Sequence, residues 1–215
     1  MTGPDDVRRT YDLIADDYDR EIGDELDHKP LDRALLTALV EMVGTGRLAD
    51  VGCGPGHVTR YLATLHDDVV GLDLSPGMVA IARSHAPSIA FEVASMLALP
   101  VADGSWAGAV LLYSVIHLSP AERVVAFREL ARVVRPGGPV LVSFHVSDIE
   151  QSAGSSKHLT SWFGHDVDVS VGFLDPDVIA TELAAAGLSV TATTLREPGE
   201  GEYPSRRAYL LTSRS

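Results

Sequence analysis

Leu48-Ala-Asp-Val-Gly-Cys-Gly-Pro-Gly-His-Val-Thr-Arg60 is the stretch that decides how the rest of this chain is interpreted. A short apolar run reaches Asp50 and breaks into Gly52, Gly54 and Gly56, after which apolar residues return at helical spacing. Glycine permits positive φ and places no Cβ between the backbone and a ligand. The N–H groups of such a turn can therefore approach a polar small molecule. The stretch predicts a strand, a tight turn and a helix N-terminus that together form a ligand site.

The length and composition are those of one folded domain. The 215 residues are 46% hydrophobic and 22% charged, which suits a single α/β domain with a covered core. No run approaches the roughly 18 apolar residues of a membrane span, and the acidic N-terminus lacks the apolar core of a signal peptide. Cys53 is the single cysteine, so an internal disulfide is excluded and a reducing, cytoplasmic compartment is expected.

The net charge bears on partners. It is −13, with an isoelectric point near 4.9, and an acidic surface repels phosphate backbones. Basic residues gather only in pairs such as Arg8-Arg9 and Arg206-Arg207. We therefore expect a small-molecule partner, no nucleic acid, no membrane, and a monomer or homodimer.

Strand and helix patterns alternate along most of the chain. A first helix is predicted over 5–19, and the other helices over 30–43, 56–65, 77–86, 121–134 and 176–186. Strands are predicted over 47–51, 68–73, 89–93, 108–113, 139–145, 189–195 and 206–212. Such alternation predicts an α/β fold with a doubly wound, mostly parallel sheet and helices on both faces. The last two strands are joined by a segment too short for a crossover helix, so the last strand should be antiparallel.

Residues 146–175 lack a clear period and are rich in Ser, Gly, Asp and His. An irregular stretch of this length inside a compact domain is usually a binding loop or a lid. We therefore expect this segment, together with the N-terminal residues, to cover the site and to select the substrate.

The position of the third glycine separates two classes of cofactor. A dinucleotide-binding turn needs Gly-x-Gly-x-x-Gly, and counting from Gly52 its third glycine would fall at His57. The pattern from Asp50 to Gly56 instead resembles motif I of class I S-adenosylmethionine-dependent methyltransferases. Asp73 closes the second strand, where the family has an acidic residue that accepts hydrogen bonds from both ribose hydroxyls.

Further segments carry the same resemblance in the expected order. They are Tyr11-Asp-x-Ile-Ala-x-x-Tyr18-Asp, Val93 to Trp106, Val110 to Leu118, and Leu130-Ala-Arg-Val-Val-Arg-Pro-Gly-Gly138. The match is close over 5–145 and holds in outline over 176–213. It implies a small-molecule methyltransferase domain of the type 11/25 kind, with a Rossmann-like seven-stranded sheet in the order 3-2-1-4-5-7-6.

The resemblance also implies how the single domain, 1–215, is organised. A helical cap would occupy 1–43, the cofactor-binding core 47–145, the substrate loop or lid 146–175, and a C-terminal helix and β-hairpin 176–215. The implied cofactor is S-adenosylmethionine, with S-adenosylhomocysteine as its product.

The resemblance assigns candidate residues to each part of the site. The cofactor-binding candidates are Tyr18, Asp50, Gly52, Cys53, Gly54, Asp73, Leu74, Met78, Ser95, Met96, Leu97 and Tyr113. The substrate-side candidates are Tyr11, Tyr18, His117, His145, Trp162 and Arg206. The chain departs from the family at Ser95, where an aspartate is common, and at Trp106-Ala107, where a carboxylate is common.

His117 and His145 follow the fourth and fifth strands at the ends where open α/β sheets bind ligands. Each is a candidate general base for an oxygen nucleophile, and each could instead fix a loop by bonding to the backbone. Tyr11 and Tyr18 could likewise pack the first helix or approach the methyl group. The histidines lack close ligand spacing with a cysteine or carboxylate, so no metal is expected.

The implied reaction is an in-line SN2 methyl transfer to an oxygen or nitrogen, less readily a carbon, of a small molecule. The alternative is a protein of this fold that binds S-adenosylmethionine without methyl transfer, as an electrostatic catalyst or a binding module. A nucleic-acid amino-methyltransferase would carry Asp/Asn-Pro-Pro-Tyr/Phe after the fourth strand, where this chain has Leu112-Tyr113-Ser114-Val115. A nicotinamide dehydrogenase does not fit the third glycine or the antiparallel end of the sheet.

Overall fold

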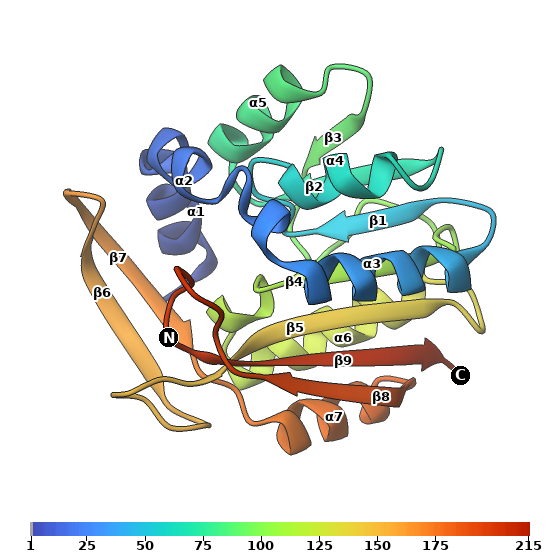
Figure 1. The fold of residues 1–215 in the computed structure, drawn as a ribbon. Coiled ribbons are helices and arrows are strands. Elements are labelled where there is room, and N and C mark those ends of the chain that lie inside the picture. The colour runs from blue at the N-terminus through green and yellow to red at the C-terminus, as the bar shows by residue number, and fades with distance from the viewer. Residues whose placement is uncertain (1) are drawn as a thin grey trace.

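A seven-stranded sheet runs through the computed structural model, which describes residues 2–215 (Figure 1). The strands are β1 (Leu48–Val51), β2 (Val69–Asp73), β3 (Ala90–Val93), β4 (Gly108–Leu112), β5 (Pro139–Ser147), β8 (Leu188–Arg196) and β9 (Arg206–Arg214). Their order is β3-β2-β1-β4-β5-β9-β8, and β9 alone runs in the direction opposite to the other strands. Counted within the sheet this is 3-2-1-4-5-7-6, so the predicted fold class is confirmed.

The two faces of the sheet follow from the alternation of side chains along each strand. On β4, Ala109 and Leu111 join one apolar cluster with residues of α6 (Pro120–Val133) and α7 (Pro176–Ala185). Val110 joins the opposite cluster, with residues of α3 (Pro30–Val43) and α4 (His57–Ala63). Helix α5 (Pro76–His85) packs against β2 and β3. The central strands are thus buried on both faces, as parallel strands require.

The N-terminal segment forms two helices, so the single helix expected over 5–19 was wrong. Helix α1 (Pro4–Leu13) ends at Ile14, whose φ of −98° and ψ of 7° break the helix, and α2 (Ala15–Ile22) begins directly after it. A 3₁₀ turn, η1 (Glu25–His28), then leads into α3. The apolar positions keep helical spacing across the break, which is why periodicity could not reveal it.

Residues 146–175 are largely regular, so the expectation of an irregular segment was also wrong. Strands β6 (Ser156–Trp162) and β7 (His165–Gly172) pair antiparallel as a hairpin outside the main sheet. Phe163 and Gly164 at its tip have φ of 51° and 80°, and positive φ at both central residues is the type I′ hairpin geometry. Phenylalanine is rare at such a position, and both faces of β6 are partly exposed, so the usual sequence signals were weak.

The hairpin stands beside α1 and α2, at the edge of the molecule where β1 and β4 end (Figure 1). The Thr10 hydroxyl donates to the carbonyl of Asp168, and the amide of Ser170 donates to the hydroxyl of Thr2. None of the helices within residues 2–215 is long and apolar enough to cross a membrane.

Candidate active site

The glycine turn after β1 has the backbone geometry that the sequence predicted. Gly52, Gly54 and Gly56 have φ of 79°, 53° and 83°, in the left-handed region that favours glycine. A Cβ on Gly52 would lie 2.2 Å from the Cβ of Ser114, so a side chain is excluded there. The amide of Gly52 donates to the carbonyl of Leu72 at 2.7 Å, which ties the turn to the end of β2.

Asp73 closes β2 directly beside this turn. Its Oδ2 accepts from the amide of Gly54 and its Oδ1 from the amide of Ser75, both at 2.8 Å. Burial raises the pKa of Asp73, and the nearby charge of Asp12 also acts to raise it, while the backbone hydrogen bonds act to lower it. A carboxylate has about four acceptor positions, so two amide donors leave it able to accept two more hydrogen bonds, as a pair of ribose hydroxyls requires.

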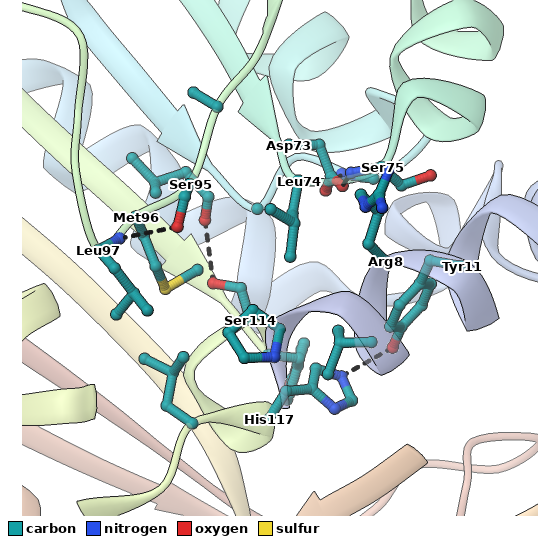
Figure 2. Close-up of a pocket in the computed structure, with 18 of the residues that line it drawn as sticks. Arg8, Tyr11, Asp73, Leu74, Ser75, Ser95, Met96, Leu97, Ser114 and His117 are labelled. Carbon is teal, nitrogen blue, oxygen red and sulfur yellow. Dashed lines mark hydrogen bonds between the residues drawn. The ribbon is translucent and has the colours of Figure 1, made fainter. Parts of the chain in front are cut away.

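A first cavity opens at Asp73 (Figure 2). Asp73 and Leu74 border one side of it, Ser95 and Met96 another, and Ser114 lies below them. The predicted cofactor residues that line it are Tyr18, Gly52, Gly54, Asp73, Leu74, Ser95, Met96, Leu97 and Tyr113. Nine of the twelve cofactor candidates therefore surround one space, at the carboxyl ends of β1, β2 and β4.

The other three cofactor candidates do not border this first cavity. Asp50 is 1% exposed, its Oδ2 accepts from the hydroxyl of Thr59 at 2.6 Å, and burial raises its pKa to about 6. Cys53 is 3% exposed, and burial raises the pKa of its thiol. Met78 is fully buried. Asp50 and Cys53 instead border a second cavity.

A second, larger cavity of about 610 Å³ adjoins the first. It lies between α2, η1, the β6–β7 hairpin and the loop that joins β8 to β9. The residues that border both cavities are Tyr11, Tyr18, Gly52, Gly54, Leu112, Tyr113 and His117. The two spaces therefore meet at the ends of β1 and β4.

Tyr11 and His117 form a hydrogen-bonded pair at this junction (Figure 2). The Tyr11 hydroxyl lies 2.8 Å from His117 Nε2, and His117 Nδ1 lies 3.0 Å from the carbonyl of Ser170. Because a carbonyl only accepts, Nδ1 carries the proton and Nε2 accepts from Tyr11. Burial lowers the pKa of His117 to about 4 and raises that of Tyr11, so both groups are neutral at pH 7.

His145, the other candidate base, lies deeper in the second cavity. Its Nδ1 is 2.6 Å from the hydroxyl of Ser205, and its ring stacks on Tyr113 with centroids 5.0 Å apart. Burial, followed by the charges of Arg207 and Lys29, lowers its pKa to about 3. The structure thus brings His117, but not His145, to the place where the two cavities meet.

Aromatic rings from three elements gather above the junction. Tyr11, Tyr18 and Trp162 meet edge to face, with ring centroids 5.5 to 5.8 Å apart, and Phe163 stacks on Trp162. Desolvation raises the pKa of Tyr18, so its hydroxyl stays protonated. Such a cluster excludes water and presents ring faces and edges to whatever occupies the space.

The structure does not place Arg206 in the site. Arg206 is exposed and pairs with Glu197, whereas its neighbour Arg207 is 2% exposed and borders the second cavity. Successive residues of a strand face opposite sides, so an error of one position reverses the direction of the side chain. Lys29 and Glu25 also border this cavity. Neither lies in a segment whose apolar residues recur at helical or strand spacing, so periodicity could not point to them.

The residues present fit S-adenosylmethionine. The glycine turn lets a ligand approach the backbone at Gly54, the Asp73 carboxylate retains acceptor positions, and a cavity joins them. Together with the strand order and the antiparallel β9, these features define the fold of class I S-adenosylmethionine-dependent methyltransferases.

Comparison with known proteins agrees with this class. Residues 48–138 match the family described as methyltransferase domain. It is 34% identical over 142 residues to a demethylmenaquinone methyltransferase of Beutenbergia cavernae, covering 65% of this chain and 55% of that protein. It is 38% identical over 121 residues to a trans-aconitate 2-methyltransferase of Methylobacterium nodulans, covering 54% and 45%. The chain thus spans about half the length of these relatives.

A solved structure extends the likeness in fold to the whole chain. The complex of DhpI with SAM and HEP superposes with a TM-score of 0.75 at 21% identity, covering 100% of both chains. The cap and the C-terminal elements therefore have counterparts in the fold of that protein.

Proposed function

We propose that this protein transfers the methyl group of S-adenosylmethionine to an oxygen or nitrogen atom of a small molecule. The observation that carries the proposal is the junction of the two cavities. The Asp73 side fits a nucleoside, and the larger cavity next to it fits an acceptor, with Tyr11 and His117 between them. The two relatives act on demethylmenaquinone and trans-aconitate by their names, acceptors that differ enough to leave the nucleophile open.

The cofactor supplies an electrophilic methyl group on a positively charged sulfur. The chain holds the nucleoside through Asp73, with Ser95, Met96 and Leu97 beside the adenine. The glycine turn brings backbone groups close to the remainder of the molecule. Helices α1 and α2 and the hairpin close the space, so Tyr11, Tyr18 and Trp162 exclude water from the reacting atoms. Fixing donor and acceptor in line can lower the barrier by roughly 7–11 kcal/mol.

His117 with Tyr11 can remove the proton of an acceptor hydroxyl. The Tyr11 oxygen would accept the proton of the acceptor hydroxyl while its own proton passes to His117 Nε2, so the two transfers would be concerted. The carbonyl of Ser170 would stabilise the resulting cation through Nδ1–H. An acceptor that arrives as a neutral amine, or already ionised, needs only orientation.

The test combines binding and turnover on the same protein. Titration calorimetry should detect S-adenosylmethionine and S-adenosylhomocysteine but not NAD, and a screen of small phenols, amines and acids should release S-adenosylhomocysteine with at least one acceptor. Tight binding without turnover on any acceptor would instead favour a protein that uses the fold without methyl transfer. Tight binding of NAD would exclude both functions.

A further inference from the structure

Two buried cations lie close to one tyrosine ring in the second cavity. Lys29 is 8% exposed and Arg207 is 2% exposed. Lys29 Nζ lies 5.7 Å, and the Arg207 guanidinium carbon 6.0 Å, from the centre of the Tyr113 ring. All three residues border the cavity, and His145 lies against the same ring. We call Lys29, Tyr113, His145 and Arg207 the basic corner.

The hydrogen-bonding groups left unused in the basic corner are donors. Arg207 donates to Glu202 and to two carbonyls through its terminal nitrogens, while its Nε has no acceptor among residues 2–215. Lys29 Nζ donates to Glu25, which leaves two of its three protons. His57, which borders the same cavity, donates from Nε2 to the Glu25 carboxylate, because a carboxylate only accepts.

The neighbouring carboxylates are already engaged. Glu202 accepts from Arg196 through both oxygens and also from the amide of Gly199, besides its bond to Arg207. Burial acts to raise the pKa of Glu202. These hydrogen bonds and the charges of Arg207 and Arg196 outweigh it, so the pKa is lowered to about 2. A buried donor without an acceptor is costly. A ligand that fits here must therefore bring acceptor atoms.

An anion also meets less electrostatic repulsion at the basic corner than elsewhere on the molecule. Lys29, Arg196 and Arg207 pair with the carboxylates of Glu25, Glu202 and Asp32, so these three cations and three anions cancel, in a chain whose net charge is −13. Of the other acidic residues that border the cavity, Glu21, Asp24 and Glu200 are exposed, so solvent screens their charges. Asp50 is buried and accepts from the hydroxyl of Thr59.

Tyr113 is held in a strained conformation at the centre of this corner. Its φ is 56°, a value that non-glycine residues rarely adopt. The hydroxyls of Tyr113 and Tyr209 lie 2.8 Å apart, and Tyr209 donates in turn to Asp32. Such strain persists where the surroundings fix it and is concentrated at functional sites.

We propose that the basic corner binds the oxyanion of the methyl acceptor, a carboxylate or a phosphonate, so that the substrate is a small organic acid. The proposal rests on the proposed methyl transfer. Lys29 and Arg207 donate to the acid oxygens, and the Tyr113 ring supports the group from one side. Since Tyr113 borders both cavities, an acid bound here places the rest of the acceptor toward Tyr11 and His117.

Titration calorimetry on the full chain loaded with S-adenosylhomocysteine tests this with three probes of similar size. Benzoate and phenylphosphonate carry the acid group, and benzamide is the uncharged match. We expect the acids to bind at least tenfold more tightly than the amide. Arg207→Met and Lys29→Met should each remove that preference, whereas Arg206→Met, on the opposite side of the same strand, should keep it.

Each outcome decides a separate point. Equal binding of the acids and the amide, or an acid preference that survives both Lys29→Met and Arg207→Met, would overturn the basic corner as an acid site. Stronger binding of phenylphosphonate than of benzoate would identify a phosphonate as the better ligand. Retained S-adenosylhomocysteine affinity shows that each variant is folded, and Lys29→Met alone decides if Arg207→Met does not fold. If the wild type fails to bind S-adenosylhomocysteine, the proposed function fails instead.

Discussion

At the scale of the residue, Asp73 links the glycine turn to the proposed nucleoside site. Asp73→Ala removes a buried carboxylate that accepts two backbone amides and retains acceptor positions at the cavity. We expect at least a tenfold loss of S-adenosylhomocysteine affinity, about 1.4 kcal/mol, since charged hydrogen bonds are lost. Calorimetry checks the value, with the exposed Asp67→Ala as the matched control. Wild-type affinity in Asp73→Ala would refute the ribose assignment.

His117 should make the stability of the fold depend on pH. Burial holds its pKa near 4, below the ordinary 6.5, so the unfolded chain takes up a proton that the folded chain refuses as the pH falls between these values. The free energy of unfolding contributed by neutral His117 is therefore full above pH 6.5 and declines toward pH 4.

The variant His117→Asn isolates this effect from the other titrating groups. The difference in unfolding free energy between wild type and variant should shrink by about 1 kcal/mol between pH 7.5 and 5.5. Urea unfolding at the two pH values measures it. A difference that is constant, or that grows on acidification, would show that His117 is not buried in its neutral form.

Most of the residues predicted to bind the cofactor border one cavity, because they follow strand ends and glycines, which have fixed spacing. Asp73 and Ser95 border the first cavity as expected. The acceptor side was harder to predict. Arg207 rather than Arg206 faces the second cavity, and Lys29 lies in a turn where no period applies. These positions depend on register and on packing between distant segments, which a single sequence does not encode locally.

At the scale of the element, acidic residues fasten the N-terminal helices over the site. Asp12 on α1 accepts from the hydroxyl of Ser75 and the amide of Gly77, where it stabilises the positive end of α5. Asp19 on α2 lies 2.7 Å from His85 at the other end of α5. Helices α1 and α2 thus follow α5 along its length, and this docking sets where Tyr11 and Tyr18 lie.

A hydrogen bond joins the tip of the β6–β7 hairpin to α2. Asp17 Oδ2 lies 2.8 Å from His165 Nε2. Asp17→Asn should weaken this contact, so amide hydrogens of 156–172 should exchange about two- to fivefold faster, the range expected for an exposed pair. Hydrogen exchange with mass spectrometry measures the rates. Asp16→Asn, an exposed neighbour on the same helix, should leave them unchanged, and equal effects of both variants would count against the contact.

The elements of the main sheet were predictable because each is buried and bounded by glycine, proline or a cap. Helix α6 shows this: Ser119 and Glu122 form a capping box on either side of Pro120, and the helix ends just before the Arg135-Pro-Gly-Gly138 turn. The hairpin has no comparable signals, and it packs mainly on α1 and on residues 115–117 after β4. Its strands are stabilised by contacts with residues far away in the sequence, so local patterns could not predict them.

At the scale of the whole molecule, two segments cover one site. They are the helices α1 and α2, which precede the central sheet in the sequence, and the β6–β7 hairpin, which follows β5; we call them the two covers. The N-terminal helices and the hairpin contact each other through Thr10 and Asp17, and His117 bridges Tyr11 to Ser170. Both segments border the second cavity. If these covers enclose the bound cofactor, they cannot open without exposing it or releasing it. Ligand binding should then suppress the openings of both covers together.

Limited trypsin digestion detects such coupling at the scale of the molecule. Arg20 on α2 and Lys157 on β6 are accessible cleavage sites on the two covers, with side chains 72% and 37% exposed. Where cleavage requires opening, S-adenosylhomocysteine at a hundred times its Kd should slow both cuts by up to about a hundredfold. Cleavage at the exposed Arg128 on α6, remote from the covers, should keep its rate and serves as the internal control. Protection of one cover alone would mean that the two open independently, and protection of neither would show that they do not close over the cofactor.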